Sequence, residues 1–130
     1  MTDDLPQLSP AELDVMKVLW SDGRLSAREV HDQVGPVHNW AYSTTRTTIE
    51  RLVRKGLLDK QSFHGIHVYG PTISRATGLA RLVRDFAERV LELNHSPVVS
   101  LFADSGVLSK AEIAELRALL DGEPQPGGTR

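Results

Sequence analysis

The chain has 130 residues, 40% of them hydrophobic and 25% charged, which is enough for one domain of ordinary size or for a small domain with a dimerisation arm. Its formal net charge of -2 gives no global basic signal, so a nucleic-acid-binding role needs local segregation of charge. The absence of cysteine excludes disulfides, thiol redox switching and thiolate metal sites, and it fits a reducing cytosol.

Capping boxes predict where the first two helices begin. Residues 9–12, Ser-Pro-Ala-Glu, open one helix, in which the proline suits the first position because its missing N–H would have no partner there. We expect this helix to end at residues 21–23. Residues 26–29, Ser-Ala-Arg-Glu, open a second helix, which Gly35 and Pro36 are expected to stop.

The stretch from Tyr42 to Gly56 predicts a third helix with two distinct faces. At about 100° per residue, the inward arc holds Thr45, Thr48, Ile49, Leu52, Val53 and Gly56, whereas Ser43, Thr47, Glu50 and Arg54 lie opposite. Helix propensity alone does not favour four threonines in five positions, and outward hydroxyl and guanidinium groups suit a DNA groove. Residues 40–70 also hold five Lys or Arg against two Asp or Glu, so the local charge is positive.

A β-hairpin is expected directly after this helix. Residues 57–61 and 66–70 read as two strands around a turn at 62–65, with Gly65 at its tip. Such a hairpin is a wing, and it would place His64 and His67 beside the flanking phosphates or the minor groove. The sequence therefore predicts a mainly α fold with a small β-hairpin, in which residues 1–73 form a winged helix-turn-helix DNA-binding domain.

Residues 74–94 predict a long helix with an apolar stripe, followed by a short helix opening at Ser96 and a last helix opening with a capping box at 109–112. A small winged domain cannot cover these faces, so residues 74–120 are expected to form a helical dimerisation domain. The expected interface consists of Leu79, Leu82, Val83, Phe86, Val90, Leu93, Phe102, Ile113, Leu116 and Leu120. The tail, residues 121–130, is rich in Pro and Gly and is expected to be disordered.

Several blocks, taken in order, resemble the penicillinase-repressor (BlaI/MecI) family. They are residues 11–20, Trp40, residues 44–47, 51–58, 68–69 and 108–116, and the resemblance extends over residues 8–120. It implies a homodimeric winged-helix repressor that binds a palindromic operator and dimerises through its C-terminal helices. Members commonly control β-lactamase or other cell-wall stress genes.

The resemblance also assigns roles by position. Ser43, Thr44, Arg46 and Thr47 match the groove-facing start of the recognition helix, and Arg51, Arg54 and Lys55 match its backbone-contacting end. Together with Tyr42, His64 and His67 these are the expected DNA-binding residues. The expected partners are double-stranded DNA and a second copy of the chain.

Three departures from the family pattern bear on function. Many relatives begin the recognition helix with Ser-Pro, where this chain has Ala41 and Tyr42. The copper-responsive branch uses a cysteine cluster that is absent here, which excludes copper sensing by that route. Leu101 and Phe102 match the cleavage position of antibiotic-responsive relatives, although the relatives' Asn is missing, so a protease of a sensor pathway is one candidate partner. A small ligand and a partner protein stay open as inducing signals.

Metal and enzyme functions are disfavoured by the sequence. Of the five histidines only His64 and His67 are close, and alternate residues of a strand point to different faces, so no metal site and no cofactor are expected. No catalytic elbow, phosphate loop or His-Glu-x-x-His run is found. The carboxylates of the first two helices, Glu12, Asp14, Glu29 and Asp32, are placed on solvated faces. Trp20 and Trp40 are expected to belong to the core rather than to stack on bases.

Two functions of different classes remain. The first is a sequence-specific dimeric repressor, and the second is a winged-helix protein-interaction module with only weak, non-specific DNA binding. The positive local charge and the hydroxyl-rich face favour the first. There is no run of about 18 apolar residues, and the start of the chain is acidic where a signal peptide would be basic, so we expect a cytoplasmic location.

Overall fold

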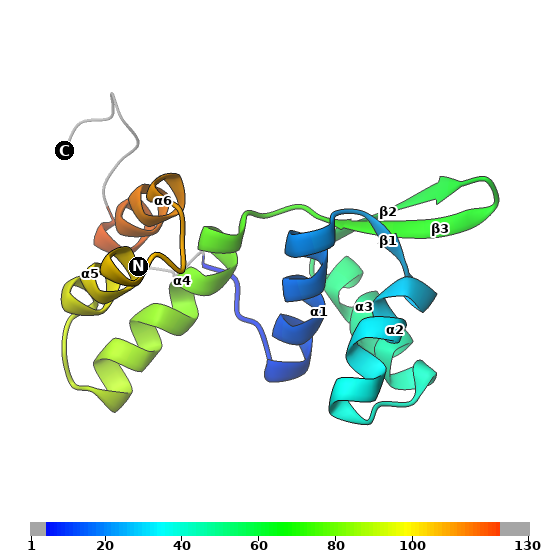
Figure 1. The fold of residues 1–130 in the computed structure, drawn as a ribbon, viewed down its shortest axis with the longest axis horizontal. Helices are drawn as coiled ribbons and strands as arrows, with labels where there is room; N and C mark the ends of the chain where they lie inside the picture. The colour runs from blue at the N-terminus through cyan, green and yellow to red at the C-terminus, as the bar shows by residue number, and fades with distance from the viewer. Residues whose placement is uncertain (1–4, 123–130) are drawn as a thin grey trace. The chain divides into compact units, whose positions relative to one another are not determined.

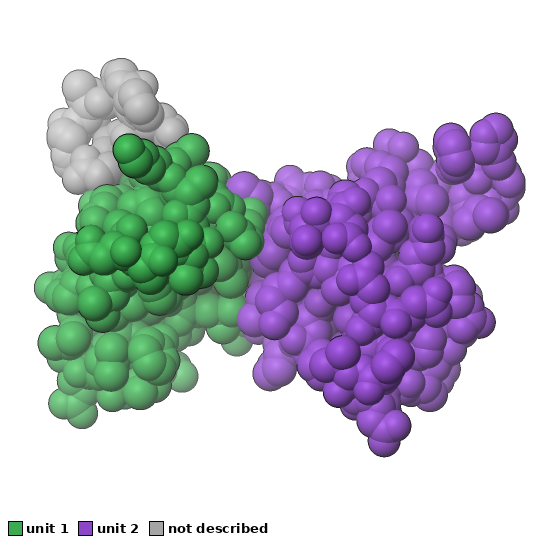
Figure 2. Space-filling view, in the orientation of Figure 1, with its two compact units in different colours: residues 1–7, 75–130 green, residues 8–74 purple. Residues whose placement is uncertain are grey.

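A computed structural model describes residues 5–122 of the chain. These residues form two compact units, one of residues 8–74 and the other of residues 5–7 and 75–122 (Figure 2). Within the described residues, no helix is both long and apolar enough to cross a membrane.

The first unit combines three helices with a three-stranded antiparallel sheet (Figure 1). Its elements are α1 (Pro10–Asp22), β1 (Leu25–Ser26), α2 (Ala27–His38), α3 (Tyr42–Arg54), β2 (Leu58–Phe63) and β3 (Ile66–Pro71). The strand order is β1-β3-β2, and Phe63 pairs with Ile66 beside a two-residue turn. Both turn residues, His64 and Gly65, have positive φ, which matches the tight hairpin turn that follows the twist of its strands. The expected mainly α fold with a small β-hairpin is confirmed.

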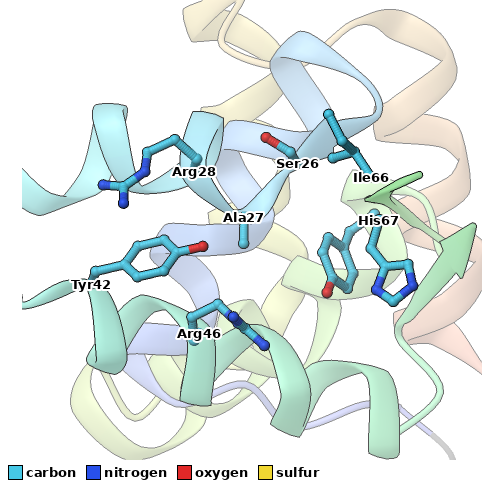
Figure 3. Close-up of a pocket in the computed structure, with 8 residues that line it drawn as sticks. Ser26, Ala27, Arg28, Tyr42, Arg46, Ile66 and His67 are labelled. Atoms are coloured by element: carbon cyan, nitrogen blue, oxygen red, sulfur yellow. The ribbon is translucent and has the colours of Figure 1, made fainter. Parts of the chain in front are cut away.

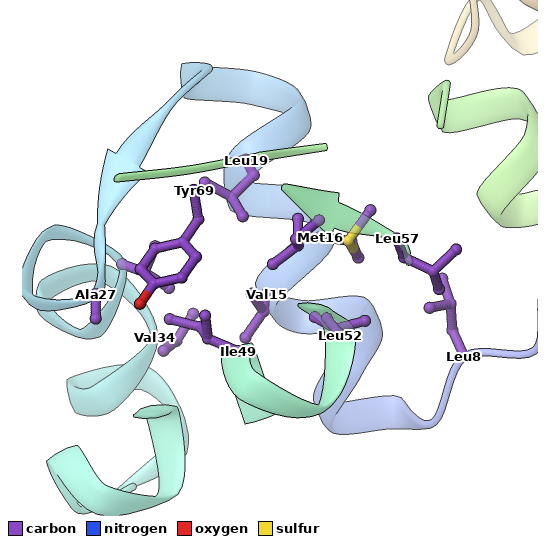
Figure 4. Packing of buried hydrophobic residues seen from close by; sticks show 12 residues of the cluster. Leu8, Val15, Met16, Leu19, Ala27, Val34, Ile49, Leu52, Leu57 and Tyr69 are labelled. Atoms are coloured by element: carbon purple, nitrogen blue, oxygen red, sulfur yellow. The ribbon is translucent and has the colours of Figure 1, made fainter. Parts of the chain in front are cut away.

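The core of this unit lies where α1 and α3 cross beneath β3 (Figure 4). Met16 and Leu19 of α1 and Ile49 and Leu52 of α3 are almost fully buried. The inward arc predicted for α3 is confirmed for Thr45, Thr48, Ile49 and Leu52, whereas Val53 is half-buried and Gly56 is exposed. Trp20 and Trp40 pack against the edge of this core, and the Trp20 indole N–H donates to the carbonyl of Ile73 at 3.0 Å.

Gly35 and Pro36 do not stop the second helix, contrary to expectation. The helix continues to His38 and ends at Asn39, which has a left-handed φ of 58° and donates its N–H to the carbonyl of Gly35. With the His31 ring in this position only glycine fits, because a Cβ at position 35 would lie 2.5 Å from that ring. The sequence also gave no sign of β1, a two-residue strand that exists only through its pairing with β3.

The second unit contains α4 (Arg75–Asp85), η1 (Phe86–Val90), α5 (His95–Ser105) and α6 (Lys110–Asp121). The single helix expected over residues 74–94 is therefore wrong. The α-helix changes at Phe86 to a π-helical turn, in which the N–H of Leu91 reaches the carbonyl of Phe86, and the chain then bends at Glu92 with a φ of 57°. A π turn adds a residue to the repeat and so shifts the side chains that follow it.

Small residues of α4 line the core of the second unit. Ala76 and Ala80 pack with Val99, Ile113 and Leu116. Gly122 caps α6 in a left-handed conformation, so the expected disordered tail does not include Asp121, and residues 123–130 lie outside the described part of the chain.

A bidentate ion pair joins α4 to the start of α6. Arg75 donates from Nε and Nη2 to the two carboxylate oxygens of Glu112, each at 2.8 Å, and the Ser109 N–H donates to the same carboxylate. The hydrogen bond from Arg75, followed by that from the Ser109 backbone, lowers the pKa of Glu112 from 4.5 to about 2. Because the folded-state pKa is depressed, the pair stabilises the fold fully above about pH 4.5, and this stabilisation is lost as the pH falls to about 2.

We expect Glu112→Gln to lower the free energy of unfolding by about 1 kcal/mol at neutral pH, a modest value because Arg75 is partly exposed to solvent. Glutamine preserves the capping box, so the change removes chiefly the charge. Urea unfolding at neutral pH and at about pH 3 measures the effect, most of which should disappear at the lower pH. An equal loss at both pH values would show that the charge is not its cause.

Candidate nucleic-acid interface

The outward face of α3 presents hydroxyl and guanidinium groups to solvent. Ser43, Thr44, Arg46 and Thr47 are all exposed, as the phase of the helix requires. The inward threonines are satisfied inside the unit, because Thr48 donates to the carbonyl of Thr44 at 2.8 Å and the Thr45 hydroxyl lies 2.7 Å from Nδ1 of His31. The two threonine pairs of this helix therefore have different roles, one in packing and one at the surface.

A buried carboxylate anchors the opposite end of α3. Glu12 is only 2% exposed, contrary to the expectation that it lies on a solvated face. The start of α1 packs beside the end of α3, so that Lys55 Nζ lies 2.8 Å and Arg51 Nη1 lies 3.9 Å from the Glu12 carboxylate. Arg51 and Lys55, predicted to contact the DNA backbone, thus also hold α3 against α1.

The charge of Glu12 is maintained by these partners. Burial raises the pKa of its carboxyl group, but the hydrogen bonds from Lys55 and the Ser9 backbone and the charges of Lys55 and Arg51 outweigh this, so the net pKa is below its ordinary value. Glu12 is therefore ionised at neutral pH, as its pairing requires.

A hollow of about 420 Å³ lies beside the outward face of α3, between the start of α2 and β3 (Figure 3). Three of the predicted DNA-binding residues line this hollow, namely Tyr42, Arg46 and His67. The remaining lining residues are Ser26, Ala27, Arg28, Ile66 and Tyr69. Burial, and then the charge of Glu50, raises the pKa of Tyr69, so its hydroxyl keeps its proton at neutral pH.

Arg28 is the residue of this site that sequence reasoning missed. Its guanidinium carbon lies 4.2 Å from the ring centroid of Tyr42, and that of Arg46 lies 6.0 Å from the same ring. A signal was present in the sequence, because a cation in the first turn of a helix opposes the helix dipole and so needs another reason to be there. Arg28 is the second residue of α2, after the N-cap Ser26 and the first helical residue Ala27.

The two wing histidines do not come together at one place. His64 is at the tip of the hairpin, with its ring 4.3 Å from that of Phe63, whereas His67 lines the hollow. Phe63 and Ile66 are both exposed, which gives the tip an apolar surface. Among the residues that the structure describes, no three His, Asp or Glu side chains are grouped so that they could hold a metal ion.

The expected dimer-interface residues fall into two sets. Val83, Ile113 and Leu116 are buried in the core of their own unit, with Leu79, Phe102 and Leu120 packed against it. Leu82, Phe86, Val90 and Leu93 are exposed, the last three on η1 and the bend after it. Leu101, one of the two candidate cleavage residues, is exposed on α5, and its neighbour Phe102 is half-buried.

Comparison with known proteins finds relatives along almost the whole chain. The profile of the family described as "Penicillinase repressor" matches residues 8–122. A penicillinase repressor of Bacillus licheniformis is 31% identical over 117 residues, which are 90% of this chain and 91% of the relative. The methicillin resistance regulatory protein MecI of Staphylococcus aureus (strain N315) is 28% identical over 88% of this chain and 94% of its own.

Two solved structures match the first unit by fold and sequence. The solution structure of the DNA binding domain of the repressor BlaI aligns with a TM-score of 0.52 and 33% identity, covering 58% of this chain and 93% of that one. The Bacillus licheniformis BlaI monomeric form, solved in complex with the blaP half-operator, aligns with a TM-score of 0.51 and the same identity and coverage.

Glu12→Gln should lower the free energy of unfolding by about 2 kcal/mol, because it removes the charge that holds Lys55 while retaining a capping residue. Chemical denaturation at neutral pH measures this loss. Glu29→Gln is the matched control, since Glu29 has the same capping role on an exposed face and its replacement should stay within about 0.5 kcal/mol of the wild type. Equal effects of the two changes would refute a special role for the buried pair.

Proposed function

The chain belongs to the penicillinase repressor family, and we propose that it is a homodimeric transcriptional repressor that binds a palindromic operator in double-stranded DNA. The observation that carries this proposal is the difference between the two faces of α3. One face is buried, and the opposite face exposes Ser43, Thr44, Arg46 and Thr47. The complex of the related BlaI with a half-operator supports DNA as the partner. The name of the Bacillus licheniformis relative, penicillinase repressor, supports β-lactamase genes as targets. The proposal also includes other cell-envelope stress genes as alternative targets and a cytoplasmic site of action.

The chemistry of the face fits the major groove of DNA. Hydroxyl groups near the start of α3 can donate to phosphates and base edges, and the guanidinium group of Arg46 can form two parallel hydrogen bonds to a guanine. Arg54 at the other end of the helix is exposed and suits a phosphate. The wing histidines, His64 at the hairpin tip and His67 beside the hollow, offer ring nitrogens next to this helix face.

A second copy of the chain is proposed to cover the exposed apolar residues of the second unit. Phe86 is 48% and Val90 is 63% exposed, and Leu82 and Leu93 are exposed beside them in sequence. Grouped apolar surface of this kind is typical of an interaction site. A closed two-fold dimer would place two recognition helices on one palindrome.

We expect selection of bound duplexes from a random DNA pool to recover a palindromic motif, with half-sites about one helical turn apart or a multiple of this. Arg46→Ala should weaken binding by about 10-fold per half-site, or roughly 100-fold for a dimer on the full palindrome, and reduce discrimination at one base pair of each half-site, because one bidentate contact is worth about 1–3 kcal/mol. Titrations on the selected duplex and on its single-base variants measure both effects.

The control for this change is Lys17→Ala, which also removes one positive charge but on the exposed side of α1. It should leave both affinity and base preference unchanged. If no motif is recovered and binding is weak on every duplex, the repressor proposal fails and the protein-interaction function gains support.

We expect the wild-type chain to sediment as a dimer at micromolar concentration and Phe86→Glu to shift it towards the monomer. Phe86 is half-exposed in the single chain, so a charge there should disturb an intermolecular contact more than the fold. Val37→Glu adds the same charge at an exposed apolar position of α2 and should remain dimeric. Analytical ultracentrifugation with circular dichroism separates dissociation from unfolding, and a monomeric wild type would end the dimer proposal.

A further inference from the structure

The hollow between α2, α3 and β3 has the chemistry of a site for a phosphodiester chain. Tyr42, Ile66 and Tyr69 give it an apolar surface, Arg28 and Arg46 supply positive charge, and His67 supplies ring nitrogens for hydrogen bonds. None of its lining residues is acidic. A sugar–phosphate backbone presents the complementary pattern, since its sugars are partly apolar and its phosphates are anionic.

Tyr42, at one side of this hollow, is held in place by packing on a neighbouring ring. Its ring meets the edge of His31 at a centroid distance of 5.4 Å and an interplanar angle of 79°. His31 is fixed in turn, because its Nδ1 lies 2.7 Å from the Thr45 hydroxyl and its ring occupies the space left by the missing side chain of Gly35. The Tyr42 ring is therefore packed against His31 and is not a free surface group.

Two guanidinium groups lie near the face of the Tyr42 ring. Arg28 comes from α2 and Arg46 from α3, and the Tyr42 side chain lies between them (Figure 3). A cation within about 6 Å of an aromatic centroid is attracted by the negative charge of the ring face. The interaction brings Arg28 to the hollow from a helix other than the recognition helix, and it offsets the unfavourable position of a cation in the first turn of α2.

We propose that Arg28 binds a DNA phosphate at this hollow and that Tyr42 is the positioning residue that aims it there. This inference rests on the proposed function and adds to it a contact outside α3 and the wing. The starts of α2 and α3 both border the hollow, and Ala41, the N-cap of α3, has no side-chain oxygen to accept from the first N–H groups of that helix. A phosphate would satisfy such groups while it pairs with Arg28.

The test measures the affinity of the full-length chain for a selected duplex and for an unrelated duplex at several salt concentrations. Each neutralised phosphate contributes about 0.9 to the slope of log affinity against log salt. Arg28→Ala should therefore reduce the slope by about 1 on a half-site duplex and by about 2 on a full palindrome bound by a dimer. It should weaken binding to both duplexes by similar factors and leave base preference unchanged, because phosphates carry no sequence.

Two substitutions at Tyr42 test the positioning role. Tyr42→Leu removes the aromatic face and should weaken binding by about 2- to 5-fold, whereas Tyr42→Phe keeps this face and should weaken binding less than Tyr42→Leu does. Thermal unfolding of each variant shows whether it is folded under the binding conditions. Wild-type affinity in Tyr42→Leu would overturn the positioning role.

The remaining outcomes separate this inference from the proposed function. If the wild type shows no salt-dependent binding to any duplex, the proposed function itself fails. If the wild type binds and Arg28→Ala keeps the full salt slope, the phosphate contact is wrong while the repressor proposal stands. A changed base preference in Arg28→Ala would also overturn the assignment, because Arg28 would then contact a base.

Discussion

The geometry of the first unit depends on the ion pair of a buried carboxylate. Removing Glu12 from water is costly unless its charge is paired, so Lys55 and the N–H of Ser9 must be near it whenever α1 and α3 are packed together. These partners lie at the end of α3 and before α1, far apart in sequence. The pair thus selects one arrangement of the two helices, and the apolar contacts of Ile49 and Leu52 set the rotation of α3.

The other end of α3 is fixed by a second polar contact. The Thr45 hydroxyl is within hydrogen-bond distance of Nδ1 of His31, and the His31 ring fills the space that a side chain at Gly35 would occupy. With Glu12 at one end and His31 at the other, α3 is tied to both preceding helices, so its backbone needs little ordering when the exposed face meets a partner. The benefit is entropic, because side chains on a rigid support lose less freedom on binding than those on a mobile loop.

Structural features set by residues close together in the chain were predictable from the sequence, whereas features that depend on contacts between distant segments were not. The capping boxes of Ser9, Ser26 and Ser109 lie where the sequence placed them, because both members of each box are within three residues. The phase of α3 was predictable for the same reason. The burial of Glu12 and the pairing of β1 require segments more than 40 residues away. Arg28 was missed because its support, Tyr42, belongs to another helix.

One continuous apolar stripe was expected over residues 74–94, whereas the structure separates buried small residues from exposed large ones. Before the π-helical turn, α4 buries small residues, Ala76 and Ala80, which allow close helix packing. Leu82 of α4 and Phe86 and Val90 of η1 face solvent, whereas Ala87 within the π-helical turn is buried. Burying a large apolar side chain is worth about 1.5–3 kcal/mol, so a unit that buries alanines and exposes such residues gains from association. The buried small residues and the exposed large ones thus form separate surfaces, the first for folding and the second proposed for a second copy.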